Sequence, residues 1–169
     1  MKKYELIGSP NSDGLRRVRN LDGKMGGWIE SEANLSHEGS SWVADNAKVS
    51  GFALVSGDAQ VSGFAQVSGN SWVYGNAKVA DNAEVSGDAK VSGDAKVSGF
   101  AQVSDDAQVL GDAWVFGNAQ VSGDAQVSGF AQVSDNAQVY GKAVISYEAR
   151  VSGNAKVSGD SWVSGKLLV

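Results

Sequence analysis

The sequence contains no cysteine and no threonine, a single proline, Pro10, and a single histidine, His37. Without cysteine, disulfide bonds and thiolate metal sites are excluded. No apolar run approaches the ~20 residues that a membrane-spanning helix needs. The basic N-terminus also lacks the sustained apolar stretch of a signal peptide. We therefore expect a cytoplasmic protein, or one of the host cytoplasm if a phage encodes it, with no membrane partner.

A basic surface is also lacking. The chain has 14 basic and 19 acidic residues, giving a formal net charge of -5. Residues 1–42 carry equal numbers of each sign, so the whole acidic excess lies in residues 43–169. Proteins that bind nucleic acid directly usually carry a clustered positive footprint. We therefore expect no direct nucleic-acid binding.

A strict period of six residues dominates the rest of the chain. From Val43 to Val169 a branched aliphatic residue stands at every sixth position, with Ile145 the one replacement for valine. Four residues after each comes an alanine, except at three places. The consensus unit is V-S-G-D-A-Q. An unbroken fixed period of this kind indicates a solenoid, in which each repeat packs against its neighbours.

Each unit reads as a short strand followed by a corner. In Ala59-Gln60-Val61-Ser62 the first and third side chains share one face, and the second and fourth share the other. This predicts a four-residue strand with small apolar residues inward. The following Gly-Asp or Gly-Asn pair is typical of a turn, because both members tolerate positive φ.

Two architectures fit this rhythm, a flat meander of hairpins and a coil of stacked parallel strands. The meander would leave its Val/Ala face in water, and open sheets rarely exceed ~10 strands without curling. A coil turns that face inward, and three hexads make a triangular turn of 18 residues. Burial therefore favours the coil, in which each inward valine contributes on the order of 1.5–3 kcal/mol.

The repeat over residues 43–169 resembles the hexapeptide-repeat rule of left-handed parallel β-helices. The resemblance implies the left hand of the coil, since ordinary parallel crossovers are right-handed. We expect an all-β, left-handed parallel β-helix with a triangular cross-section and about 7–8 coils. Residues 25–169 form the β-helix, with regular hexads at 43–169. Residues 1–24 form a small N-terminal cap with strands near 4–7 and 15–19.

The six-residue frame is expected to continue upstream of Val43. Met25/Ile29, Ser31/Leu35 and His37/Ser41 fall at the same two inward positions when the frame is extended backwards. Residues 26–30, 34–36 and 39–43 also resemble the opening cassette of a bacterial and phage group of hexapeptide-repeat proteins, commonly labelled transferases. Fold alone does not establish such an activity.

An acyltransferase is the enzymatic alternative that the resemblance raises. Those enzymes add an active-site histidine and a long protruding loop to the coil. Here no loop interrupts residues 43–169, and His37 lies in the cassette at an inward position of the pattern. We therefore expect a structural histidine, no catalytic residue, no cofactor and no metal site.

Aromatic and aliphatic residues at outward positions are candidate contacts. Columns repeat every 18 residues, so Leu54 should lie over Trp72 and Val144 over Trp162. Exposed tryptophan and tyrosine on a rigid platform are typical interface anchors, although such cross-strand pairs also steady a sheet. The candidate interface residues are Leu54, Trp72, Tyr74, Leu110, Trp114, Phe116, Val144 and Trp162. Hexapeptide-repeat proteins commonly trimerise, so we expect a homotrimer, or a dimer.

Aspartates are expected to stack at one corner of the coil. Asp88, Asp106 and Asp124 fall on consecutive turns, with Asp105 beside them. Aspartate is a good turn residue, yet like charges ~5 Å apart repel. The ladder is therefore either a run of corners or an anionic strip that recruits a cation or a basic partner.

The C-terminal residues Leu167, Leu168 and Val169 break the polar pattern. They predict either a plug on the last coil or an apolar end that contacts another chain. From these features we predict a non-catalytic, oligomeric solenoid that presents aromatic and acidic ladders to a partner protein, in a phage, a mobile element or a bacterial scaffold. The alternatives are an acyltransferase-like enzyme and an acidic DNA-mimic inhibitor.

Overall fold

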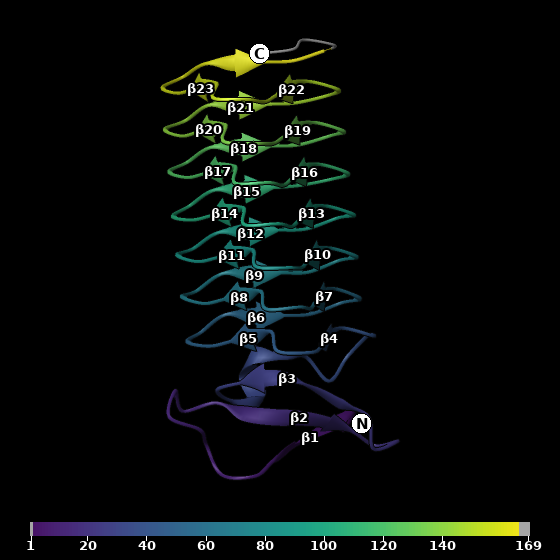
Figure 1. Cartoon of the computed structure of the whole chain (residues 1–169). Helices are drawn as coiled ribbons and strands as arrows, with labels where there is room; N and C mark the ends of the chain where they lie inside the picture. The colour runs from purple at the N-terminus through teal and green to yellow at the C-terminus, as the bar shows by residue number, and fades with distance from the viewer. Residues whose placement is uncertain (1, 166–169) are drawn as a thin grey trace.

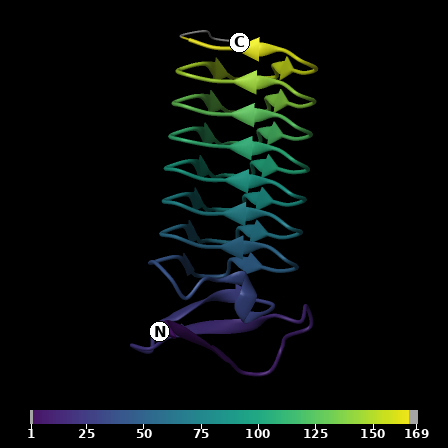
Figure 2. The same cartoon turned by 180° about the vertical axis from the view of Figure 1, so that it is seen from behind.

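The computed structural model describes residues 2–165. The chain forms a straight rod of stacked triangular turns, with the N-terminal cap at one end and the last turn at the other (Figures 1 and 2). Strands that are consecutive in sequence lie in different sheets, and every third strand pairs in parallel. The predicted triangular coil of 18 residues per turn is confirmed.

Three sheets make the sides of the triangle, and we name them A, B and C. Sheet A runs from the cap along the whole rod and contains β1 (Tyr4–Ile7), β2 (Arg16–Asn20), β3 (Met25–Ile29), β5 (Lys48–Val49), β8 (Gln66–Val67), β11 (Glu84–Val85), β14 (Gln102–Val103), β17 (Gln120–Val121), β20 (Gln138–Val139) and β23 (Lys156–Val157). Sheet B contains β6 (Leu54–Val55), β9 (Trp72–Val73), β12 (Lys90–Val91), β15 (Gln108–Val109), β18 (Gln126–Val127), β21 (Val144–Ile145) and β24 (Trp162–Val163). Sheet C contains β4 (Trp42–Val43), β7 (Gln60–Val61), β10 (Lys78–Val79), β13 (Lys96–Val97), β16 (Trp114–Val115), β19 (Gln132–Val133) and β22 (Arg150–Val151).

The core is a column of valines and alanines along the rod axis. The repeat valines from Val43 to Val151 and Ile145 are fully buried, as are the alanines from Ala47 to Ala149. Ser71 replaces one alanine, and its hydroxyl donates a hydrogen bond to the carbonyl of Ser68. The buried hydroxyl therefore has a partner, which removes most of the cost of placing it inside.

Each strand of the repeat, from β4 to β24, contains two residues rather than the four that the pattern predicted. The corner begins at the second residue after each valine, and hydrogen bonding between successive coils continues past the strand to the residue in between. The N–H of Ser68, for example, donates to the carbonyl of Val85 at 2.9 Å. The same bond recurs from every corresponding position through Ser146. The turns are thus linked along their backbone well beyond the strands themselves.

The corners need residues that accept positive φ. Glycine fills most of them, and its absent Cβ matters: at Gly93 a Cβ would lie 2.9 Å from the N and O atoms of Gly111. Where aspartate replaces glycine, φ remains near +60° and the carboxylate accepts a hydrogen bond from the glycine N–H one turn later. This holds for all four positive-φ aspartates, Asp45, Asp81, Asp105 and Asp135.

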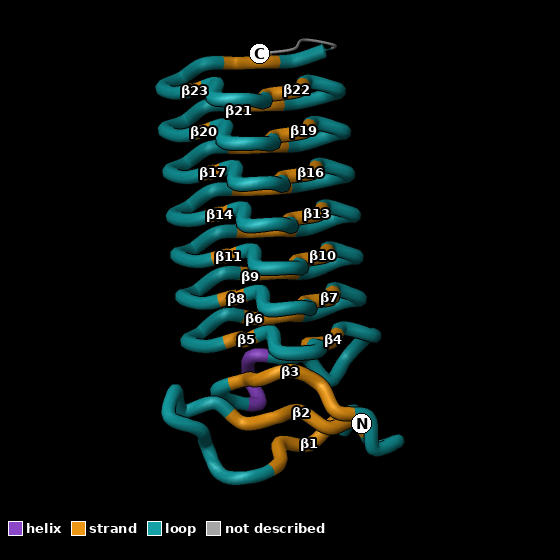
Figure 3. The backbone as a smooth tube through the Cα atoms, viewed as in Figure 1, coloured by secondary structure: helices purple, strands orange, loops and turns teal. Residues whose placement is uncertain are grey.

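The predicted N-terminal cap is present, and the structure shows that it is an antiparallel extension of sheet A. β1 pairs with β2, and β2 pairs with β3, both antiparallel. β3 then pairs in parallel with β5 and so joins the cap to the solenoid (Figure 3). A three-residue 3-10 helix, η1 (Glu32–Asn34), follows β3. Arg17 lies over the ring of Trp28 with its guanidinium carbon 4.7 Å from the ring centre.

The prediction that the six-residue frame continues upstream of Val43 is wrong by two residues. Ile29 pairs with Val49 and Leu35 with Val55, twenty residues on, whereas Trp42 pairs with Gln60, eighteen residues on. The two extra residues lie in the loop between Leu35 and Trp42. A shift of two keeps side chains on the same face, and it places the bulky Ile29 and Leu35 in the wider valine columns instead of the alanine columns.

The corner aspartates give a matched test of stability. Because Asp105 accepts a bond from the Gly123 N–H at 3.0 Å, Asp105→Ala should lower the free energy of unfolding by about 1–2 kcal/mol. Asp106, beside it, makes no such bond among residues 2–165, so Asp106→Ala should change it by less than about 0.5 kcal/mol. Urea unfolding of both variants checks this, and equal losses would contradict it.

Candidate interaction surface

Sheet B makes one side of the triangular rod and carries exposed aromatic residues, and we call this side the aromatic wall. β6 places Leu54 beside Trp72 of β9, and β21 places Val144 beside Trp162 of β24. Trp72 is 50% exposed and meets Tyr74 edge-on, with the ring centres 6.3 Å apart. Leu54, Leu110 and Val144 are partly buried. Six of the eight predicted interface residues therefore lie along the sheet B side of the rod, with Trp72 and Tyr74 toward its N-terminal end and Trp162 at the other end.

Trp72 differs from Trp114 and Trp162 in its hydrogen bonding. Trp114 donates its indole N–H to the Ser98 hydroxyl at 3.2 Å, and Trp162 donates to Ser146 at 3.1 Å, in each case sixteen residues back. For Trp72 the equivalent residue is Ser56, but no bond between them is present in the described part of the chain. The indole N–H of Trp72 is left available to a ligand or partner.

The aspartate ladder occupies the corner next to Trp72. Asp88, Asp106 and Asp124 stand on consecutive turns, and Asp88 accepts a bond from the side-chain amide of Asn70 at 2.8 Å. Asp105 does not belong to this ladder, because its carboxylate accepts a hydrogen bond from the Gly123 N–H. Within residues 2–165, no cluster of three or more acidic or histidine side chains could hold a metal ion.

A shallow hollow of about 280 Å³ joins the aromatic wall to the acidic corner. The sequence predicted the aromatic surface and the aspartate ladder as two separate features, whereas in the structure Trp72 lies beside Asp88 and Asp106. Lys90 lies in the same hollow and makes no ion pair with either carboxylate in the part of the chain that the structure describes. The lining residues are Asn70, Trp72, Asp88, Lys90, Asp106 and Gln108.

The remaining candidate residues lie elsewhere. Trp114 and Phe116 belong to sheet C, where their rings stack at 4.3 Å with a 34° tilt. They form a self-contained pair on a different side of the triangle from Trp72. The candidate end contact, Leu167, Leu168 and Val169, lies outside the described residues.

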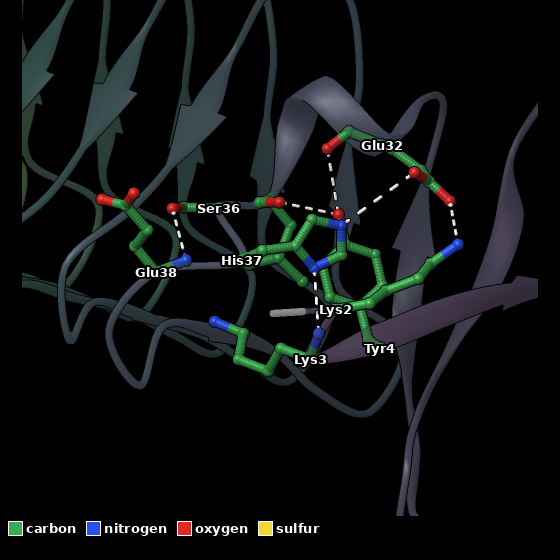
Figure 4. Close-up of polar contacts among 8 residues, drawn as sticks. Lys2, Lys3, Tyr4, Glu32, Ser36, His37 and Glu38 are labelled. Atoms are coloured by element: carbon green, nitrogen blue, oxygen red, sulfur yellow. Dashed lines mark hydrogen bonds and ion pairs between the residues drawn. The ribbon is translucent and has the colours of Figure 1, made fainter.

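His37 sits in the contact between the cap and the first turn (Figure 4). Its ring stacks on Tyr4 with the centres 4.3 Å apart, and its Nδ1 accepts the backbone N–H of Lys3. The neutral ring therefore carries its proton on Nε2, which lies 4.0 Å from the carboxylate of Glu32. Nδ1 and one ring face thus attach the start of β1 to the loop around residue 37, while Nε2 faces Glu32 of η1.

Tyr4 is the buried centre of that cluster. Its hydroxyl lies 2.6 Å from the carbonyl of Leu35 and 2.9 Å from that of Glu32. Burial, with a smaller contribution from the Glu32 charge, raises the pKa of Tyr4 to about 12. The hydrogen bond from Lys2 is the main reason that the pKa of Glu32 is lowered. The cluster is neutral at its centre and charged only at its rim.

The structure contains a second aromatic hollow that was not predicted from the sequence. Tyr147 takes the place of a corner glycine at φ +58° and, with Phe130, lines a hollow of about 540 Å³ near the C-terminal end. The signal in the sequence was the loss of glycine or aspartate at that corner. Positive φ in a bulky residue is uncommon and costs energy.

Comparison with known proteins identifies the repeat but no activity. Residues 131–147 and 149–165 match the family model described as the YdcK Beta solenoid repeat. These two matches cover the C-terminal turns alone and agree with the β-solenoid described above. No curated protein matches the chain. Of the described residues, only η1 is helical, and its three residues are far too few to cross a membrane.

The pKa of Tyr4 predicts a loss of stability in alkali. The unfolded tyrosine titrates near 10, and the folded one near 12. The folded protein thus holds this proton more tightly, so its stability is intact below about pH 10 and falls as the pH rises toward 12. Tyr4→Phe should be less stable at pH 8 but should lose less on going to pH 11.5. Urea unfolding at both pH values tests this, and identical losses would contradict it.

Proposed function

We propose that this protein is a non-catalytic interaction rod that uses the Trp72 side of sheet B to bind a partner protein. The observation that carries the proposal is the hollow in which Trp72, half exposed and with a free indole N–H, adjoins the carboxylates of Asp88 and Asp106. The backbone beneath it is fixed by bonds to the turns on either side. A rigid platform loses little conformational freedom on binding, which favours affinity.

The chemistry of the hollow favours a basic segment of the partner. A guanidinium or ammonium group can lie over the indole of Trp72 while the two carboxylates accept its hydrogen bonds. The acidic excess of residues 43–169 acts in the same direction by speeding association. Lys90 opposes such a ligand, so its side chain would move aside when the partner binds.

Self-association through the same wall is part of the proposal. The likeness of the hexads to left-handed hexapeptide-repeat proteins supports a side-by-side homotrimer or dimer. The protein itself would then be an interaction protein encoded by a phage or a mobile element, or a bacterial scaffold. An acyltransferase would need His37 for chemistry rather than for packing on Tyr4, and acetyl-CoA affinity that is lost in His37→Ala would overturn the non-catalytic proposal.

Trp72→Ser is the direct test. We expect it to reduce capture of the partner from host lysate at least tenfold, or to lower the solution mass if the wall binds sister chains. Trp114→Ser is the matched control, because it removes an exposed tryptophan from sheet C. Thermal unfolding confirms that both variants fold. Capture and mass that are unchanged by Trp72→Ser, or equally reduced by both variants, would contradict the proposal.

A further inference from the structure

Sheet B has acidic residues along both of its edges. Asp88 lies at the corner before β12, and Asp94 lies at the corner after it. One turn later, Asp106 and Asp112 take the same two places around β15. All four aspartates are exposed. Two consecutive rungs of the aromatic wall, β12 and β15 in Figure 1, are therefore bordered by a carboxylate on each side.

The two edges are built alike. Asn70 donates its side-chain amide to Asp88 at 2.8 Å on one edge, and Asn76 donates to Asp94 at 2.9 Å on the other. Each bond occupies one carboxylate oxygen, and the second oxygen of each aspartate accepts no hydrogen bond within residues 2–165. The two aspartates around β15 accept none there at all. The carboxylates of both edges can therefore bind a cationic ligand.

The middle of the wall, between the two edges, carries apolar side chains. Trp72 and Tyr74, on the rung before β12, are 50% and 36% exposed, and Leu110 follows β15 with its side chain partly buried. Lys90 stands between them and forms no ion pair in the described part of the chain. Its apolar stem can lie along the surface while its ammonium group turns to solvent. The wall thus combines an apolar middle with two acidic edges.

The backbone of the wall is already hydrogen-bonded. The N–H of Trp72 donates to the carbonyl of Ala89, and the N–H of Lys90 donates to that of Ala107, both at 2.9 Å. A partner must therefore bind through side chains, because the flat side offers no main-chain groups for an added strand. An extended segment would also present a single row of side chains to the wall, since successive residues point to opposite faces.

An amphipathic helix matches the two acidic edges and the apolar middle together. Its apolar residues, at spacings of three and four, form one stripe, and the residues beside that stripe project to the left and right of it. Six residues separate Asp88 from Asp94, which is ~20 Å of extended chain at most. A helix with its side chains is ~10–12 Å across. Lysine and arginine on its two flanks can therefore reach both edges.

We infer that sheet B binds an amphipathic helix of the partner that carries basic residues on both sides of its apolar stripe. This inference rests on the proposed function, because it names the class of partner that the Trp72 side binds. The apolar stripe contacts Trp72, Tyr74 and Leu110, and the basic flanks pair with the aspartates of the two edges. The helix lies along the rod, because both rows of aspartates run in that direction.

The test uses two synthetic helical peptides of about 18 residues, which are ~27 Å long as helices. Both contain the same leucines in one stripe and the same number of lysines. In the first peptide the lysines flank the stripe on both sides, and in the second they lie on the opposite face of the helix. Fluorescence anisotropy gives the Kd of each for the full chain at about 50 and 300 mM salt, and circular dichroism confirms that both are helical.

We expect the flanked peptide to bind at least tenfold more tightly than the second peptide. This advantage should shrink at the higher salt concentration, because exposed charges are screened. Asp88→Asn with Asp106→Asn removes the charge of one edge, and Asp94→Asn with Asp112→Asn removes that of the other. Each pair should raise the Kd of the flanked peptide about fivefold or more, by similar factors.

The chain offers matched controls for both pairs. Asn70 and Asn76 occupy the same corner columns naturally, so the asparagine variants should fold, as thermal unfolding checks. Glu38→Gln with Glu84→Gln changes the net charge equally but away from sheet B, and should leave the Kd within about twofold. Lys90→Gln should lower the Kd about threefold, because it removes the one cation that opposes the ligand.

Two results would overturn the inference and leave the proposed function standing. The first is equal binding of the two peptides, or no binding of either, while Trp72→Ser still reduces partner capture or solution mass. The second is a flanked peptide that Trp72→Ser weakens but Asp94→Asn with Asp112→Asn does not, because the ligand would then contact a single edge. A flanked peptide whose Kd is unchanged by Trp72→Ser would contradict both.

Discussion

Backbone hydrogen bonds between turns, repeated at eighteen-residue intervals, hold this protein together and determine what its sequence can vary. Each bond requires neighbouring turns to lie in register, and each corner must then fit beneath the next one. This explains why glycine recurs at the corners and why aspartate is accepted there, since its carboxylate binds the N–H of the turn that follows. Inside, the narrow triangle is filled mainly by valine beside alanine.

Most of this architecture could be predicted because it is periodic. The inward columns, the corner positions and the closure of the apolar face follow from the six-residue spacing and from burial. The left hand of the coil is an expectation that the family resemblance adds, because periodicity carries no information about hand. The strand length was overestimated, since a side-chain pattern of four residues does not reveal where the backbone bends.

The first turn could not be predicted, because its residues differ from the repeat in size. Ile29 and Leu35 are too bulky for the alanine columns, and a two-residue shift moves them into the valine columns. No spacing rule in the sequence reports that exchange. The same shift moves His37 out of the core pattern and into contact with Tyr4, which turns a predicted inward residue into part of the cap attachment.

The candidate surface was partly predictable for the same reason. The eighteen-residue spacing predicted the positions of Trp72 and the aspartate ladder, but not the hollow that joins them. The free indole N–H of Trp72 depends on side-chain conformations that no spacing encodes, because Trp114 and Trp162 have a serine at the same offset and do bond to it. Three consecutive hexads offer one exposed outward residue on each side of the triangular rod. These residues are Glu84 on sheet A, Lys90 on sheet B and Lys96 on sheet C.

The claim that sheet B is the binding side is tested most directly by photo-crosslinking at those three positions in turn. With a photoreactive residue at position 90, the account predicts a crosslink to one partner protein or to a sister chain, and little at positions 84 and 96. Equal crosslinking from all three sides, or crosslinking from position 84 or 96 alone, would contradict it.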